Sequence, residues 1–354
     1  MEQVKTLGIV GRIAAGTKLC DGQTIKTRVL RDELRVKYPE AEINIVDVYN
    51  YKKRLFTIIW ELIDCLKNSQ IVIVLLSRNG RRFIFPLISF FNLFFHKPLI
   101  HDVIGGGSVE LIQKYPRLKK YYLKFEDNWV ESVGLKNALG EIGIHNVTYI
   151  PNFKRLNAIQ ESDLKPYAEE VFRFCTFSRV NEEKGIGRAV EAISAINAKA
   201  GRYVAVLDIY GPIEDGYEKQ LENFIALSNG CVDYKGVADS NQSVEILKNY
   251  YCLLFPTTFY GEGFPGTLID AMSAGIPVIA TDWHMNGDII KHGTTGFVYP
   301  CEHHEKLEEL IAYSMEHRQK INAMKSDCIR ESKKYSPDEV IRIIDEKIRL
   351  FIRG

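Results

Sequence analysis

The chain has 354 residues, of which 46% are hydrophobic and 26% are charged. This length predicts about two domains, since a domain typically has on the order of 150 residues, and the composition excludes an intrinsically disordered chain. The 46 Lys and Arg residues are balanced by 45 Asp and Glu residues, which excludes a global field that would collect nucleic acid, so any anion site must be local.

Short apolar runs that resemble buried strands recur along the chain. In the first half they cover residues 7–10, 43–48, 71–76 and 98–103. Segments long enough for helices separate them, and this alternation predicts a parallel sheet with helices packed on it. After a polar stretch at residues 160–166, five further runs follow the same rule, at residues 172–177, 203–210, 232–234, 252–255 and 277–280.

The alternation therefore predicts two Rossmann-like domains, residues 1–160 and residues 168–336. The chain from about residue 302 onward is charged and rich in helix-forming patterns. Residues 337–354 carry apolar side chains at helical spacing, and we expect them to form a terminal helix that packs back on the first domain.

A glycine-containing loop follows the first predicted strand. Gly11 and Gly16 flank the sequence Arg-Ile-Ala-Ala, which resembles a dinucleotide-binding fingerprint but lacks its third glycine. Two interpretations stay open at this point. Either the glycines let the backbone approach a diphosphate, or the loop is an ordinary connection between a strand and a helix.

An aromatic and basic segment follows the third predicted strand. Residues 81–97 are apolar except at the ends, which carry cations, and residues 49–56 form a second aromatic and basic stretch. Interfacial membrane binding combines apolar burial with attraction to anionic lipid. The alternative is a helix buried between the sheet and a neighbour. The candidate membrane contacts are Arg81, Arg82, Phe90, Phe91 and Phe94.

His101 ends the fourth predicted strand, just before Asp102 and three consecutive glycines. The C-terminal ends of parallel strands border the crevice in which ligands of such sheets bind. His101 is therefore either a site residue or a structural histidine.

A basic loop follows the first strand of the second half. Arg179 and Lys184 lie five residues apart on this loop, together with Glu182 and Glu183. Two cations beside a helix start can neutralise a diphosphate. The alternative is a solvated loop in which the cations pair with the two glutamates.

The most informative segment is residues 261–280, GEGFPGTLIDAMSAGIPVIA. It enters a predicted helix near Pro265 and stops at Gly275 before the next strand. The backbone N–H groups at such a helix start form a site for phosphate or diphosphate. The candidate phosphate-binding residues of this segment are Gly263, Phe264, Pro265, Gly266 and Thr267.

Two carboxylates accompany this helix start. Glu262 precedes the helix and Asp270 lies within it, about 12 Å away at helical rise. With the diphosphate between them, one carboxylate could hold a sugar and the other a ribose. The alternative, a solvated glutamate and an ordinary helix aspartate, is less favoured in this Gly-Phe-Pro-Gly-Thr context.

The segment from Glu262 through the Ala-Met-Ser-Ala-Gly-Ile-Pro run resembles the signature of retaining glycosyltransferases of family 4, the glycosyl transferases group 1, as found in bacterial polysaccharide assembly. The resemblance is strong over residues 172–300 and weak over the first 150 residues. The family pattern has Glu where this chain has the shorter Asp270. The resemblance implies an α/β protein of the GT-B fold, with two Rossmann-like parallel-sheet domains facing across a cleft and C-terminal helices.

The same resemblance implies roles for residues outside this segment. The matching Arg and Lys of the family contact the donor phosphates, which points to Arg179 and Lys184. A histidine placed like His101 meets the donor hexose near the reacting carbon. The turns that flank the nucleobase correspond here to Tyr210, Gly211 and Val237.

The function implied is a retaining transfer of a hexosyl residue from a nucleoside diphosphate sugar, with UDP as the expected nucleotide. The acceptor implied is a glycan, expected to be lipid-linked, in the biosynthesis of a cell-surface polysaccharide. No carboxylate can be nominated as a covalent nucleophile, so front-face substitution is the expected mechanism. Two alternatives stay open: a nucleotide-sugar epimerase of the GT-B fold, and a non-catalytic sugar-binding partner subunit.

No Asp-x-Asp sequence occurs, so we expect no metal and no other cofactor. The seven cysteines form no Cys-x-x-Cys pair, which indicates a reduced, intracellular chain. The first residues lack the parts of a secretory signal, and the longest uncharged run, residues 83–95, is shorter than the roughly 20 residues of a membrane span. We expect a cytoplasmic protein with peripheral contact to the inner face of the membrane and no nucleic-acid partner.

Overall fold

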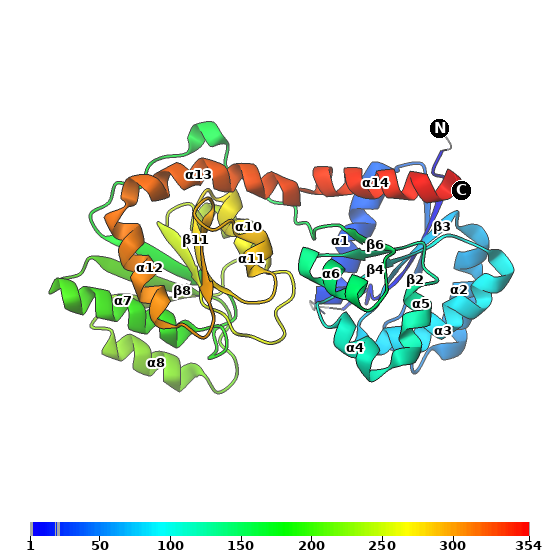
Figure 1. Ribbon diagram of the computed structural model, residues 1–354, viewed down its shortest axis with the longest axis horizontal. Helices are drawn as coiled ribbons and strands as arrows, with labels where there is room; N and C mark the ends of the chain where they lie inside the picture. The colour runs from blue at the N-terminus through cyan, green and yellow to red at the C-terminus, as the bar shows by residue number, and fades with distance from the viewer. Residues whose placement is uncertain (1–2, 18, 20–21, 354) are drawn as a thin grey trace. The chain divides into compact units, whose positions relative to one another are not determined.

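The computed structural model describes residues 3–17, 19 and 22–353, and the chain divides into two compact units (Figure 1). Unit 1 comprises Met1–Phe153 and Pro337–Gly354, and unit 2 comprises Lys154–Ser336. Each unit is built on one six-stranded parallel sheet with helices packed against it, which is the Rossmann-like architecture predicted from the alternation of strands and helices.

The sheet of unit 1 has the strand order β2-β1-β3-β4-β5-β6. Its strands are β1 (Thr6–Gly11), β2 (Glu42–Asp47), β3 (Ile71–Leu75), β4 (Leu99–Asp102), β5 (Asp127–Val130) and β6 (Val147–Tyr149). In the register of the sheet, Val10 lies beside Val46 on one side and beside Val74 on the other. Because helices cover both faces, the central strand β3 is apolar along its whole length.

The helices of unit 1 connect successive parallel strands. They are α1 (Gly22–Lys37), α2 (Leu55–Asn68), α3 (Arg78–Phe95), α4 (Ser108–Lys114), α5 (Lys119–Tyr122) and α6 (Val133–Glu141). The C-terminal helix α14 (Pro337–Arg353), drawn in red in Figure 1, packs against α1 and β3. Its buried Val340, Ile344 and Ile348 belong to the same hydrophobic cluster as Leu30 and Leu34 of α1.

The sheet of unit 2 has the strand order β12-β11-β10-β7-β8-β9. Its strands are β7 (Phe172–Phe177), β8 (Ala205–Tyr210), β9 (Val232–Gly236), β10 (Cys252–Phe255), β11 (Val278–Asp282) and β12 (Gly296–Pro300). Its helices are α7 (Ile186–Ala200), α8 (Glu218–Leu227), α9 (Ser243–Leu247), α10 (Gly266–Ser273), α11 (Asn286–Ile289), α12 (Glu305–Glu316) and α13 (Arg318–Ser332). The reversal of strand order lies between β7 and β10, which is where ligands of open parallel sheets bind.

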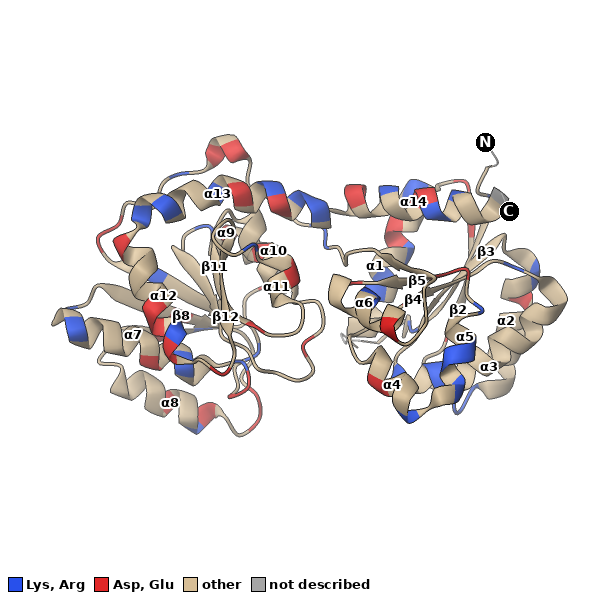
Figure 2. Ribbon diagram, viewed as in Figure 1, with Lys and Arg blue, Asp and Glu red and all other residues tan. Residues whose placement is uncertain are grey.

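Helix α3 has one buried and one exposed face. Ile84, Phe85 and Ile88 are fully buried against the sheet, whereas Phe90 and Phe94 are 55% and 69% exposed. The alternative of a helix buried between the sheet and a neighbour is therefore wrong for the C-terminal half of α3, which carries Phe90 and Phe94. Much of α2 and α3 is tan in Figure 2, since few of their residues are charged. No helix in the described part of the chain is long and apolar enough to span a bilayer.

The prediction that Arg81 contacts a membrane is wrong. Its side chain is 1% exposed and lies inside unit 1. It donates hydrogen bonds at 2.5–2.9 Å to the carbonyls of Leu76 and Ile104 and to the hydroxyls of Ser108 and Tyr122. These acceptors compensate the cost of burying the guanidinium, so Arg81 holds the start of α3 on the sheet. Arg82, the next residue, is exposed.

Candidate active site

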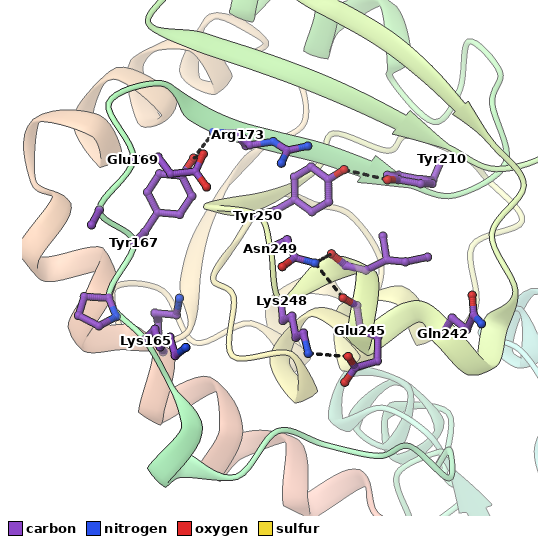
Figure 3. A pocket seen from close by; sticks show the side chains of 14 residues that line it. Lys165, Tyr167, Glu169, Arg173, Tyr210, Gln242, Glu245, Lys248, Asn249 and Tyr250 are labelled. Atoms are coloured by element: carbon purple, nitrogen blue, oxygen red, sulfur yellow. Dashed lines mark hydrogen bonds and ion pairs between the residues drawn. The ribbon is translucent and has the colours of Figure 1, made fainter.

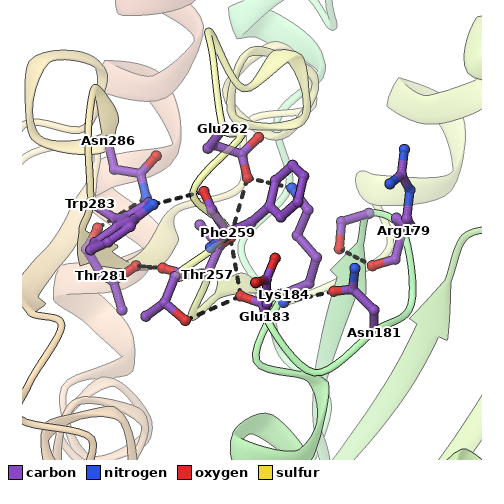
Figure 4. Close-up of polar contacts among 12 residues, drawn as sticks. Arg179, Asn181, Glu183, Lys184, Thr257, Phe259, Glu262, Thr281, Trp283 and Asn286 are labelled. Atoms are coloured by element: carbon purple, nitrogen blue, oxygen red, sulfur yellow. Dashed lines mark hydrogen bonds and ion pairs between the residues drawn. The ribbon is translucent and has the colours of Figure 1, made fainter. Parts of the chain in front are cut away.

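The loops after β7 and β10 meet at the C-terminal edge of the sheet in unit 2 (Figure 4). The backbone N–H of Thr258 donates to the carbonyl of Glu183 at 2.7 Å. Gly185 has a φ of 74°, and a Cβ there would lie 2.3 Å from the carbonyl oxygen of Pro256. Only glycine permits both this conformation and this approach, so Gly185 lets the two loops close on each other.

Lys184 and Glu262 form an ion pair between these loops. Their side chains are 10% and 11% exposed, and Thr257 Oγ1 donates to the same carboxylate oxygen of Glu262 at 3.2 Å. The Lys184 ammonium also lies 4.9 Å from the ring centre of Phe259. The structure therefore brings together two residues that sequence analysis selected from separate motifs 78 positions apart.

Arg179 is the more exposed cation of the same loop. Its side chain is 53% exposed, and one guanidinium nitrogen lies 3.6 Å from Glu214. Its guanidinium carbon lies 6.0 Å from the ring centre of Phe259, the ring that Lys184 also faces. A weak, exposed ion pair of this kind leaves the guanidinium able to turn toward an incoming anion.

A second layer of hydrogen bonds fixes the loop that carries Glu262 (Figure 4). Thr281 Oγ1 donates to the carbonyl of Thr257 at 2.6 Å, and Trp283 Nε1 donates to the carbonyl of Phe259 at 2.9 Å. Asn286 Nδ2 in turn donates to the carbonyl of Thr281 at 3.0 Å. Sequence analysis did not select these positioning residues. The signal available was their place at or after the C-terminal end of β11.

Helix α10 begins at Gly266, and Pro265 is its N-cap residue, close to the predicted start. Thr267 Oγ1 is buried and has no hydrogen-bond partner among the described residues. A buried hydroxyl of this kind is uncommon, and an anion at the helix N-terminus would supply the missing acceptor. Gly263, Phe264, Gly266 and Thr267 are partly exposed at this end, whereas Pro265 is buried.

The side chain of Asp270, in α10, is more deeply buried than that of Glu262, in the preceding loop. Its side chain is 4% exposed, and both carboxylate oxygens lie 2.8 Å from the Lys154 ammonium. Burial raises the pKa of Asp270, although the charge and hydrogen bond of Lys154 oppose this shift. The structure therefore shows Asp270 paired within unit 2, and its contact with a ribose stays a prediction.

Of the residues predicted near the nucleobase, Tyr210 ends β8, Gly211 follows it, and Val237 follows β9. Gly211 has a φ of 136°, and a Cβ there would lie 1.7 Å from the carbonyl oxygen of Ser178, so the turn after β8 packs directly on the loop that carries Arg179. Val237 is 68% exposed. Tyr210 lines a cavity of about 1000 Å³, and its hydroxyl lies 2.9 Å from that of Tyr250 (Figure 3).

The two glycines of the loop after β1 have different surroundings. A Cβ on Gly11 would lie 2.8 Å from the Thr27 side chain, so this glycine permits close packing of β1 on α1. Gly16 is exposed, with a φ of 75° and nothing within 4 Å of its Cβ position. A role for either glycine in donor binding stays a prediction.

The prediction that His101 meets the donor sugar is wrong. The residue is 0% exposed and packs against the rings of Phe85, Tyr122 and Phe125, with centroid distances of 4.9–5.3 Å. Its Nδ1 lies 3.0 Å from Asn128 Oδ1. Burial, followed by the charge of Arg81, lowers the pKa of His101 well below 6.5. The residue is a neutral core histidine because its side chain points from β4 into the sheet–helix interface.

Residues 160–334 match the family model of glycosyl transferases group 1. Unit 2 is a glycosyl transferases group 1 domain. The matched range contains Arg179, Lys184, Glu262 and the start of α10, so the site described above lies within this glycosyltransferase domain.

Two curated relatives are similar over part of the chain. The amylovoran biosynthesis glycosyltransferase AmsK of Erwinia amylovora is 26% identical over 143 residues, which are 39% of this chain and 34% of AmsK. The GtfA subunit of the UDP-N-acetylglucosamine–peptide N-acetylglucosaminyltransferase of Streptococcus agalactiae is 25% identical over 210 residues, 58% of this chain and 39% of that protein. The chain thus spans little more than a third of the length of these relatives.

Solved structures match almost the whole chain. The Anabaena protein HepE, crystallised in complex with UDP, has a TM-score of 0.75 at 15% identity, and the match covers 98% of this chain and 99% of HepE. Sucrose-phosphate synthase of Thermosynechococcus elongatus has a TM-score of 0.73 at 13% identity, covering 99% and 100% of the two chains. These similarities show the fold and confirm the predicted GT-B class.

Proposed function

We propose that the protein is a retaining glycosyltransferase that moves a hexosyl residue from a UDP-sugar to a glycan acceptor. The observation that carries this proposal is the Lys184–Glu262 pair beside Arg179, within a domain that matches the family. The choice of UDP is supported by the complexes of HepE with UDP and with UDP-glucose and by the UDP-N-acetylglucosamine named for GtfA.

In the proposed reaction the anomeric carbon of the donor loses its bond to the β-phosphate oxygen and gains a bond to the acceptor hydroxyl oxygen. Both bonds lie on the same face of the sugar, and the acceptor proton goes to the departing phosphate, so UDP leaves with that proton. Lys184 and Arg179 stabilise the charge that develops on the diphosphate. Glu262, whose second oxygen is not engaged by Lys184 or Thr257, accepts hydrogen bonds from the sugar hydroxyls.

Further parts of the proposal concern cofactor, acceptor and location. Two cations and the N-terminus of α10 would supply the positive charge that a metal ion supplies elsewhere, so we propose transfer without a divalent cation. A lipid-linked acceptor in cell-surface polysaccharide synthesis is supported by the similarity to AmsK and by the exposed phenylalanines of α3. We place the enzyme in the cytoplasm, in peripheral contact with the membrane.

The epimerase alternative loses its support in this structure. His101 was the candidate for acid–base chemistry on the sugar, and it is a buried neutral histidine held among three aromatic rings. The partner-subunit alternative predicts binding without turnover, and the presence of Arg179, Lys184 and Glu262 in one cluster favours catalysis instead.

Ligand-dependent stability tests the donor. A ligand that binds only the folded protein raises Tm by mass action. We expect UDP and one UDP-sugar to raise Tm in the wild-type protein and to do so much less in Lys184→Ala, whereas Lys199→Ala, an exposed lysine of α7, should respond like the wild type. A Tm that responds to GDP or dTDP but not to UDP would contradict the assigned nucleotide.

A further inference from the structure

A basic cavity of about 390 Å³ lies in unit 1, where the chain leaves β1, β2 and β3. Its size falls within the range of small-molecule sites. Three cations line it, Arg12, Lys52 and Lys53, together with the amides of Gln23, Asn50 and Asn79, and none of the described lining residues is Asp or Glu. The lining is therefore suited to an anion with several oxygen acceptors.

The walls of this basic cavity are held in place by internal hydrogen bonds. Arg12 Nη2 donates to Gln23 Oε1 at 3.0 Å, and Gln23 Nε2 donates to the carbonyl of Leu75 at 3.0 Å. Asp47, the acid that ends β2, accepts backbone N–H groups from Ile13 and Tyr49, each at 3.0 Å. The nearby carboxylate thus serves the loops and is not a described partner of the two lysines.

The turn between β2 and α2 presents the lysines. Asn50 has a φ of 52°, a left-handed conformation that asparagine tolerates, and its carbonyl accepts the N–H of Lys53 at 2.9 Å. Lys52 and Lys53 are exposed, and neither has an ion-pair partner among the described residues. Their charge is available at the mouth of the cavity.

An apolar face adjoins the cavity on α2 and α3, which pack against each other. We call it the α2–α3 face, and its exposed side chains are Leu55, Phe56, Trp60, Phe83, Phe90 and Phe94. Phe56 is 84% exposed and Trp60 is 73% exposed, while Ile58 and Leu62 of the same helix are fully buried. Two arginines of α3, Arg78 and Arg82, are exposed, and α3 carries no acidic residue. Exposed aromatic side chains next to cations are typical of contact with an anionic lipid surface.

The basic cavity and the α2–α3 face are continuous. The ring of Tyr51, which lines the cavity, lies 5.6 Å from the ring of Phe83 on the face. Lys52 and Lys53 are separated from Leu55 and Phe56 of α2 only by Arg54, which pairs with Glu61. A molecule with an anionic head and a long apolar chain would match both surfaces at once, because the head needs cations and amides and the chain needs exposed apolar area.

We propose that unit 1 binds a lipid with a phosphate or diphosphate head. The head occupies the basic cavity, and the chain lies along the α2–α3 face at the membrane surface. The inference rests on the proposed glycosyl transfer, since it names the acceptor class as a lipid phosphate or diphosphate that carries the sugar to be extended. Arg12, Lys52 and Lys53 bind the head, and Phe56 and Trp60 bind the chain.

Three probes separate the two parts of this site: farnesyl diphosphate, inorganic pyrophosphate as the head alone, and farnesol as the chain alone. Binding is measured by calorimetry on the full chain with saturating UDP, which fills the donor site. We expect farnesyl diphosphate to bind at least tenfold more tightly than pyrophosphate. The double variant Lys52→Ala with Lys53→Ala should bind farnesyl diphosphate and pyrophosphate at least tenfold more weakly than the wild type does. Its affinity for farnesol should be unchanged.

The apolar part has its own variant. Phe56→Ser with Trp60→Ser should reduce the affinity for farnesyl diphosphate to that for pyrophosphate, and Leu227→Ser, an exposed leucine of unit 2, should change nothing. Equal affinity of the wild type for farnesyl diphosphate and pyrophosphate, or anion binding that survives loss of both lysines, would overturn the proposal. So would a wild-type dimer that Phe56→Ser with Trp60→Ser converts to a monomer, because a second copy would then cover the face.

Vesicles distinguish a head pocket from a general attraction to anionic lipid. We expect phosphatidylcholine vesicles that contain farnesyl diphosphate to bind the protein more tightly than phosphatidylglycerol vesicles of equal surface charge. Equal binding to both would overturn the assignment of the cavity. UDP binding, measured in the same variants, should stay at the wild-type level. If the wild-type protein itself does not bind UDP, the proposed function is contradicted instead.

Discussion

Lys184 and Arg179 test the electrostatic part of the mechanism. Loss of one preorganised group that stabilises developing negative charge typically lowers turnover about a hundredfold. We therefore expect Lys184→Ala and Arg179→Ala each to lower the rate of UDP release by about that factor. Arg179 is exposed, so Tm should stay close to the wild-type value in Arg179→Ala, whereas Lys184→Ala leaves the buried Glu262 carboxylate unpaired and should lower Tm. Wild-type rates in both variants would remove the assignment of the diphosphate to this loop.

Glu262 is assigned to the sugar, so its replacement should impair use of the sugar more than binding of the nucleotide. Glu262→Gln keeps the size of the side chain but removes the charge that pairs with Lys184. We expect turnover of the UDP-sugar to fall at least tenfold while the Kd of free UDP changes much less. Calorimetry with UDP and initial rates with the sugar nucleotide measure the two effects. Equal weakening of both would place Glu262 on the nucleotide instead.

The burial of His101 leads us to predict how the free energy of unfolding depends on pH. Its pKa is lowered in the folded protein, chiefly by burial, whereas in the unfolded chain it is about 6.5. Below pH 6.5 the unfolded state therefore binds a proton that the folded state does not, and stability falls as the pH falls. This contribution has a slope of up to about 1.4 kcal/mol per pH unit.

His101→Phe should remove that slope. Urea unfolding between pH 5 and pH 7 in both proteins gives the difference, because the other titrating groups are shared. We expect the wild-type free energy of unfolding to fall more steeply toward pH 5 than that of the variant. Parallel curves would show that His101 is protonated in the folded protein and would reopen its role at the site.

At the scale of single elements, the sequence predicts strands best where they are fully apolar. The predicted bounds of β10 agree with the structure, since it is an uninterrupted apolar run that is buried along its whole length. Those of β7 agree as well, although the partly buried Arg173 interrupts its apolar residues. Strand β5 was missed because it begins with Asp127 and Asn128, which are buried. Asn128 Nδ2 donates to the carbonyls of Tyr122 and Asn146, each at 3.0 Å, and partners so distant in the sequence leave no local pattern.

The candidate site shows the same limit. Glycine, proline and charge patterns at strand ends identified Lys184 and Glu262, because these patterns are local. These patterns did not distinguish Arg81 from Arg82. The two cations are adjacent in the sequence, but Arg81 is buried and Arg82 is exposed. Burial depends on acceptors that come from β3 and from the chain near α4, so it emerges only when the fold places them around the guanidinium.

Helix α3 provides a prediction at this scale. Phe90→Ser with Phe94→Ser changes two exposed side chains, so we expect nearly wild-type Tm and weaker binding to anionic vesicles. Arg82→Glu should also weaken this binding, in a salt-dependent manner. Phe85→Ser is the buried control and should cost about 3 to 5 kcal/mol, the usual penalty for truncating a core phenylalanine. Unchanged vesicle sedimentation in the Phe90, Phe94 and Arg82 variants would exclude lipid contact through α3.

At the scale of the whole molecule, each unit contributes a distinct chemistry at the C-terminal edge of its own sheet. Unit 2 gathers cations, a carboxylate and a helix N-terminus around the ends of β7 and β10. Unit 1 gathers a basic cavity beside exposed aromatic residues. The first surface is the one to which we assign the nucleotide sugar, and the second is the one to which we assign the lipid acceptor; similar sheets in the two units carry them.

The most direct test of the central claim is the release of UDP from UDP-sugars by the full chain in the presence of a lipid diphosphate-linked glycan and excess EDTA. We predict that one UDP-hexose yields UDP and an extended glycan in equal amounts, at the same rate with EDTA as with Mg²⁺, and about a hundredfold more slowly in Lys184→Ala. Release of UDP only with a divalent cation would contradict the electrostatic mechanism. Epimerised nucleotide sugar without an extended glycan, or turnover of GDP- or dTDP-sugars in place of UDP-sugars, would contradict the proposed function.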